Sequence, residues 1–335
     1  MPPFRLWADL PPELLWLIGD SLDLKSYASA RGACRAWRRA LVPPSPLLLV
    51  LDDARCCHAY ATSLPARRSF DLKAGDIRSR GRCIIGSGNG WLALYGGQRM
   101  ISLFNPMTAT EITLPPLIYN GSKWLWKLVF APNPAKDDFA AVAIYDMHRL
   151  AYVTTGAKRW VVLDPLRLGG GDQLADIVYH EKDTVYCLTR YGDVHVWRNK
   201  LCMVTLAPPT RRCVAENEVF VLRYYPQRQP CWEVVTNLGG YSVFVGRNNA
   251  VSMFAQDVPG LKGNCVYWIG DERGRDQRGM VFDMATGRST CCLPTIGVVP
   301  GGAPQNAICW YFLNDMVNNH NNNESSDPSN SFGRW

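Results

Sequence analysis

The sequence lacks the features that mark membrane proteins and zinc proteins. It contains no apolar run of about eighteen residues, so we expect no membrane-spanning segment and no membrane partner. The N-terminal residues carry no long apolar region before a small-residue cleavage site, so we expect no signal peptide. Twelve cysteines are present but none stands in a Cys-x-x-Cys pair, which argues against a zinc site.

The cysteines are scattered rather than grouped. Cys56-Cys57-His58 is the only local cluster of possible metal ligands, and no second cluster follows at a suitable spacing. We therefore expect no metal and no cofactor. Scattered thiols in a chain without a secretory signal favour a reducing compartment, which means the cytoplasm, the nucleus or both.

Charged side chains are also sparse. They make up 19% of the residues, the net charge is +7, and no block is dominated by one sign. The basic cluster consists of Arg31, Arg35, Arg38 and Arg39. A nucleic-acid patch is one interpretation, but helical periodicity places these arginines opposite Trp37 on a solvated face. We favour the second interpretation and expect no nucleic-acid partner.

No arrangement of residues indicates catalysis. Gly86-x-Gly88-x-Gly90 lacks a Gly-Lys-Ser/Thr ending and precedes a strand, so it predicts a hairpin turn rather than a phosphate loop. Asp193-Val194-His195 lies in an alternating strand, and no Gly-x-Ser-x-Gly elbow accompanies it. The sequence therefore predicts a protein without catalytic residues and without enzymatic activity.

The first forty residues predict two short amphipathic helices. Asp9-Leu10-Pro11-Pro12-Glu13 forms a helix start, because proline is tolerated in the first turn. The apolar stripe of the first helix comprises Leu14, Leu17, Ile18 and Leu22. Asp23 is the expected cap of a second helix, which Val42-Pro43-Pro44 would end. Both stripes are too large for so short a segment to bury alone, which indicates a partner.

These residues resemble the F-box. The match comprises Leu10, Pro11, Glu13, Leu14, Leu15 and Ile18, followed by Ala33, Cys34, Arg35, Trp37 and Arg38. The resemblance implies docking onto a Skp-family adaptor and, through it, a cullin-based ubiquitin ligase. By position, the adaptor-binding residues would be Leu10, Pro11, Leu14, Ile18 and Trp37. The alternative is a helical hairpin packed on the chain's own β domain.

From residue 70 onward short strands and turns alternate, and no long stretch of helical period interrupts them. We expect an F-box over 5–43, a connector over 44–69, an all-β propeller over 70–313 and a disordered Asn/Ser-rich tail over 314–335. The fold class is therefore α+β multidomain, with a small helical segment followed by a propeller of about five or six blades.

An internal repeat supports the propeller. Phe104, Trp197 and Phe282 each end a strand and precede a polar turn, a short strand and a proline. They lie 93 and 85 residues apart, and half of that spacing is the length of one blade of about 40–50 residues. A β-sandwich with coincidental hairpins is the alternative.

Several segments, among them "CIIGSGNGWLALY" and "VFVGRNNAVSMF", resemble the plant KIB-type β-propeller. An F-box before this propeller is similar to a large plant family of substrate receptors of Skp–cullin–F-box ubiquitin ligases, with the propeller binding the target protein. Some KIB-type propellers are associated with binding and inhibiting protein kinases, so an interaction module without ubiquitin transfer is the alternative. Trp124 and Trp126, on one side of a strand, are either core residues or part of a target-binding face.

Overall fold

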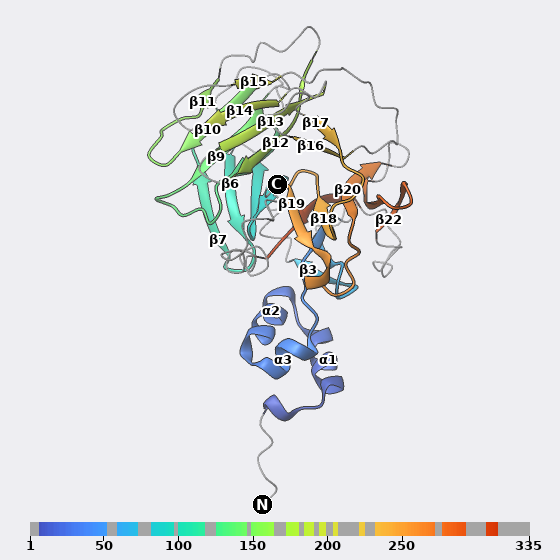
Figure 1. Cartoon of the computed structure of the whole chain (residues 1–335). Coiled ribbons are helices and arrows are strands. Elements are labelled where there is room, and N and C mark those ends of the chain that lie inside the picture. The colour runs from blue at the N-terminus through green and yellow to red at the C-terminus, as the bar shows by residue number, and fades with distance from the viewer. Residues whose placement is uncertain are drawn as a thin grey trace, which may run out of the picture.

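The computed structural model describes residues 7–51, 59–72, 82–96, 100–117, 125–145, 149–163, 172–180, 184–190, 194–198, 204–206, 221–224, 232–271, 277–292 and 306–313. Over these ranges the chain forms three short helices followed by an all-β propeller, and the helices stand below the propeller in Figure 1. The expected tail over 314–335 lies outside the described ranges.

The N-terminal helices follow the capping signals of the sequence. A short 3-10 turn, η1 (Trp7–Asp9), precedes α1 (Pro12–Ser21), which begins with proline at its first position. Asp23 caps α2 (Leu24–Ala33), because its carboxylate accepts a hydrogen bond of 2.7 Å from the backbone N–H of Ser26. The expected second helix is divided, since Cys34 is extended (φ −159°, ψ 174°) and α3 (Arg35–Ala40) begins after it.

The described residues of the β region form five blades, where about five or six were expected, and the β-sandwich alternative is wrong. Blade 1 contains β23 (Asn306–Tyr311), β1 (Leu47–Leu51), β2 (Ala59–Ser63) and β3 (Arg68–Leu72) in that order. Blade 2 contains β4 (Cys83–Gly88), β5 (Trp91–Gly96), β6 (Met100–Asn105) and β7 (Thr110–Leu114). Blade 3 contains β8 (Leu125–Phe130), β9 (Ala140–Tyr145), β10 (Arg149–Thr154) and β11 (Val161–Val162).

Blade 4 contains β12 (Leu174–His180), β13 (Thr184–Thr189), β14 (Val194–Arg198) and β15 (Val204–Leu206). Blade 5 has the order β19 (Val251–Phe254), β18 (Tyr241–Phe244), β20 (Cys265–Asp271), β21 (Gln277–Asp283) and β22 (Arg288–Cys291), and the 3-10 turn η3 (Ala255–Asp257) follows β19. Between blades 4 and 5 the chain forms a two-stranded ribbon of β16 (Leu222–Tyr224) and β17 (Trp232–Val234).

Blades 1 to 4 meet one another through their inner strands. β23 lies against β4, β4 against β8, and β8 against β12, while β20 and β21 of blade 5 lie against β23. This arrangement closes the ring at blade 1, where the C-terminal strand β23 pairs with β1. The stretch 44–69, expected as a connector, therefore contains β1, β2 and the start of β3, and belongs to the propeller.

The three aromatic residues of the sequence repeat occupy equivalent strands of their blades, as a propeller predicts, but their spacing in blades differs in one case. Phe104 in β6, Trp197 in β14 and Phe282 in β21 all occupy the strand before the last strand of their blade. Phe104 and Trp197 are two blades apart, as expected. Phe282 is only one blade beyond Trp197, because the β16–β17 ribbon occupies the residues between them.

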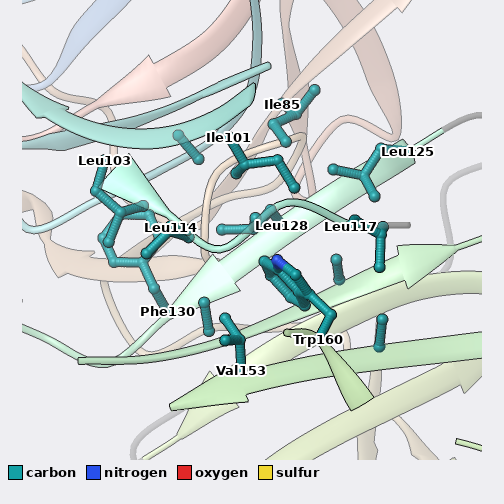
Figure 2. Close-up of a cluster of buried hydrophobic side chains, with 14 of the residues drawn as sticks. Ile85, Ile101, Leu103, Leu114, Leu117, Leu125, Leu128, Phe130, Val153 and Trp160 are labelled. Carbon is teal, nitrogen blue, oxygen red and sulfur yellow. The ribbon is translucent and has the colours of Figure 1, made fainter. Parts of the chain in front are cut away.

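The core fills the spaces between neighbouring blades. Figure 2 shows side chains of blades 2 and 3 pointing toward one another, with Ile101 and Leu103 on one side and Leu128 and Phe130 on the other. Trp160 closes this cluster, and its indole N–H donates a hydrogen bond of 2.7 Å to the carbonyl of Pro115. Neighbouring blades therefore pack face to face through layers of apolar side chains.

The glycine-rich segment of blade 2 is a hairpin, as expected. β4 and β5 are joined by Asn89 and Gly90, both with positive φ (47° and 79°). Gly86 lies at a bulge, where a Cβ atom would come within 2.0 Å of the carbonyl oxygen of Leu128 in β8. Glycine here permits the close approach of two inner strands.

Candidate functional site

The outer side of α1 is an apolar surface that the other described residues leave uncovered. Leu17 is 67% exposed, Trp16 51% and Leu14 45%, whereas Leu15 on the inner side is 1% exposed. Pro11 at the start of the helix is also exposed. Three large exposed apolar side chains on one short helix form a surface suited to a partner protein.

The residues expected at the adaptor contact divide into two groups. Pro11 and Leu14 are exposed, while Leu10, Ile18 and Trp37 are half-buried. Trp37 packs against the core between the helices and blade 1, and its indole N–H donates to the carbonyl of Trp7 at 3.2 Å. Trp37 therefore has a structural role whatever else it contacts.

Three exposed residues were not named among the expected adaptor contacts. Trp7 is 73% exposed, Leu17 67% and Trp16 51%. Leu17 was signalled by its place in the helical stripe. Trp16 lies off that stripe, and its indole N–H donates to the carbonyl of Ala40 at 2.7 Å, which anchors the ring over α3.

The helices rest on blade 1 through one continuous core. Leu24, Tyr27 and Leu41 of the helical segment share a buried cluster with residues of blade 1 such as Leu49 and Phe70. Burial raises the pKa of the Tyr27 phenol, and the nearby Arg31 and Arg68 act in the opposite direction. The phenol hydroxyl donates to the carbonyl of Val42 at 3.0 Å.

The turn after β18, residues 246–249, links the inner strands of three blades. The backbone N–H of Asn249 donates to Ser87 of β4 at 2.8 Å. Its side-chain amide exchanges two hydrogen bonds with the backbone of Tyr179 in β12, at 2.8 and 3.0 Å. Arg247 donates to the carbonyl of Ile84 in β4 at 3.1 Å. The Arg247-Asn248-Asn249 segment therefore joins blade 5 to blades 2 and 4.

A buried ion pair completes this junction. Lys127 of β8 has a side chain only 3% exposed, and its ammonium donates to the carboxylate of Asp176 in β12 and to the carbonyl of Gly246 at 2.8 Å. The Asp176 side chain remains 31% exposed. With this contact blade 3 joins the same network, so the polar residues near the ring's centre serve to tie blades together.

Of the two candidate target-binding residues, the structure describes Trp126, which lies on blade 3. Trp126 is 52% exposed at the start of β8, between the buried residues Leu125 and Lys127. Trp124 lies outside the described residues. Exposure at the entrance of an inner strand makes Trp126 available to a partner and argues against a core role.

The structure describes only part of the remaining chemical candidates. His195 is 1% exposed within β14, while Asp193 and Cys56-Cys57-His58 lie outside the described ranges. Among the residues that the structure places, no group of three His, Cys, Asp or Glu side chains could hold a metal ion. No helix in the same ranges is long and apolar enough to cross a membrane.

Comparison with known proteins identifies both parts of the chain. Residues 7–45 match the family described as F-box-like, and residues 59–212 and 197–284 match the KIB1-4 beta-propeller family. The F-box/kelch-repeat protein At1g57790 of Arabidopsis thaliana is 24% identical over 302 residues, which cover 79% of this chain and 83% of that protein. The F-box protein At3g56470 of Arabidopsis thaliana is 22% identical over 320 residues, which cover 80% of this chain and 84% of that protein.

Among solved structures, the chain of "YCF48 bound to D1 peptide" aligns with a TM-score of 0.36 and 9% identity, over 72% of this chain and 89% of its own length. That similarity is too low to carry an argument. The family match covers most of the chain and begins at β2, within blade 1. The protein belongs to the KIB1-4 beta-propeller family and carries an F-box-like segment before the propeller.

Proposed function

We propose that this protein is the substrate-recognition subunit of a Skp–cullin–F-box ubiquitin ligase. The F-box docks onto a Skp-family adaptor, and the propeller binds a target protein. The protein acts without catalysis of its own. By holding the target near the ubiquitin-carrying enzyme it raises the effective concentration of the target's lysines.

The observation that carries this proposal is the uncovered apolar side of α1. The helix buries Leu15 inward but leaves Leu14 and Leu17 in solvent, although the propeller stands directly beside the helical segment. A hairpin that served only to pack on its own β domain would turn its large apolar side chains toward that domain. Their outward position supports a separate protein as the partner.

The test is co-purification with a recombinant Skp-family adaptor. We expect Leu14→Asp and Leu17→Asp each to weaken adaptor binding by about 30-fold or more, because a charge replaces an apolar contact at the interface. Trp37→Ala is a poorer test, since Trp37 also packs in the shared core. Melting temperature and circular dichroism would confirm that the variants fold.

Leu222→Asp provides the matched control. Leu222 is 41% exposed, close to the 45% of Leu14, but it lies on β16 of the propeller. The control should retain adaptor binding. Undiminished binding of both α1 variants would contradict the proposed docking surface. Failure of the wild-type chain to bind any adaptor while still capturing a target would instead support an interaction module that blocks its partner without ubiquitin transfer.

A further inference from the structure

The C-terminal end of α1 is capped only in part by its own groups: the N–H of Leu22 donates to the carbonyl of Gly19 at 3.1 Å, and the hydroxyl of Ser21 donates to the carbonyl of Ile18 at 2.7 Å. The helix ends at Leu22 in an extended conformation, without a glycine in the left-handed region and without a basic residue in its last turn. The last carbonyl groups of a helix have no partner within the helix and carry the negative end of its dipole. A donor from another part of the chain can therefore add hydrogen bonds that the end of the helix does not supply itself.

Arg68 of β3, in blade 1 of the propeller, supplies that donor. One guanidinium nitrogen, Nη2, donates to the carbonyls of Asp20 and Leu22 at 3.1 and 3.0 Å. The other, Nη1, donates to the carbonyl of Gly19 and lies 3.4 Å from the Asp20 carboxylate. A planar guanidinium can hold several acceptors in this way at once, and its charge opposes the helix dipole.

The guanidinium is also held from the side. Its central carbon lies 4.3 Å from the ring centre of Phe70 and 5.3 Å from that of Tyr27. The two rings meet edge to face, with centres 5.3 Å apart. Phe70 belongs to β3 and Tyr27 to α2, so the arginine sits where the propeller and the helical segment join.

We infer that Arg68 is a positioning residue, which fixes α1 relative to the propeller by holding the last carbonyls of that helix. The helix that presents Leu14 and Leu17 is thus tied to blade 1 rather than free to pivot. The functional consequence rests on the proposed function: a ligase receptor with a fixed helix keeps its target at a constant distance from the adaptor. The contact itself is testable without any partner.

Hydrogen exchange measured by mass spectrometry on the free, full-length protein tests this inference. In Arg68→Met we expect the backbone amides of α1 to exchange about tenfold faster, because the helix end loses its donors and opens locally. Amides of blades 2, 3 and 4 should exchange as in the wild type. Arg68→Lys keeps the charge but lacks the planar fork, so its α1 amides should exchange at an intermediate rate.

Two control variants separate this role from general effects of charge. Arg82 is also an arginine of the propeller, with 18% side-chain exposure against 19% for Arg68, but its partner is Glu111 of β7 in blade 2. Arg82→Met should leave α1 unchanged. Asp20→Asn should also have little effect, because the Asp20 side chain is 76% exposed and the carbonyl contacts remain.

The inference is overturned if α1 in Arg68→Met exchanges within twofold of the wild type, or if Arg82→Met accelerates α1 equally. It is also overturned if exchange in Arg68→Met rises to the same degree in every blade, since that would indicate global destabilisation. Should Arg68→Met fail to fold, Arg68→Lys provides the same comparison. If the wild-type chain did not bind an adaptor, the proposed function would be refuted, but the hydrogen-exchange result for Arg68 would stand.

Discussion

Replacing Lys127 tests the junction of the inner strands. Its ammonium is almost completely buried and bridges Asp176 of blade 4 and the carbonyl of Gly246, which leads into the turn from blade 5. Lys127→Met keeps most of the side-chain volume and removes the charge. The substitution therefore isolates the polar contacts from the packing of β8.

The expected loss can be estimated from the surroundings of the pair. Removing one partner of a buried ion pair costs about 3–5 kcal/mol, because the other charge is left uncompensated. Here Asp176 retains 31% exposure and also accepts a hydrogen bond of 2.8 Å from the N–H of Ile177, so water and the backbone stabilise its charge in part. We therefore expect Lys127→Met to lower the free energy of unfolding by about 2–3 kcal/mol.

Urea unfolding followed by circular dichroism measures this loss. Asp176→Asn and the double variant Lys127→Met/Asp176→Asn complete a double-mutant cycle, in which the double variant should lose about 1–2 kcal/mol less than the sum of the single variants. A loss below about 0.5 kcal/mol for Lys127→Met, or strictly additive losses, would refute the view that this pair ties the blades together.

Two further predictions concern the propeller. Trp126→Ala should leave the melting temperature nearly unchanged and weaken capture of the target, whereas Phe130→Ala in the same strand should cost about 3–5 kcal/mol; equal losses of stability would show that Trp126 is a core residue. Burial raises the pKa of the Cys187 and Cys309 thiols from 9.0 to about 12. Just above pH 9 these thiols ionise only in the unfolded chain. The free energy of unfolding should therefore be unaffected by them below pH 9, and should fall between pH 9 and pH 12 by about 1.4 kcal/mol per pH unit for each thiol. A urea midpoint that is equal at pH 8 and pH 10 would contradict this.

Local signals in the sequence predicted local structure well. Asp23 predicted a helix cap, and Asn89-Gly90 predicted a hairpin turn, because in both cases the residues that determine the conformation are adjacent. The break at Cys34 was missed, since Trp37 continues the helical spacing across it and Gly32, two residues earlier, lies within α2. The exposed side of α1 followed from the F-box pattern, but the anchoring of Trp16 to α3 did not.

Features that depend on distant residues could not be predicted. The stretch 44–69 was interpreted as a connector because the strand that completes its blade, β23, lies at the far end of the propeller sequence. The contacts of Asn249 could not be foreseen either, because its partners Ser87 and Tyr179 belong to two other blades. Arg68 offered no signal at all, because the carbonyls that it holds belong to the backbone of α1.

The closure of blade 1 by β23 imposes an order on biosynthesis. The helices leave the ribosome early, whereas Cys309 and Tyr311, which belong to the same buried cluster as Leu24 and Tyr27, are synthesised only after nearly all other strands. Until then β1 lacks its neighbouring strand β23, and the buried cluster between the helices and blade 1 is incomplete. A chain that terminates prematurely before Asn306 lacks these packing contacts. Tight packing of the helices against blade 1 therefore distinguishes finished chains from unfinished ones.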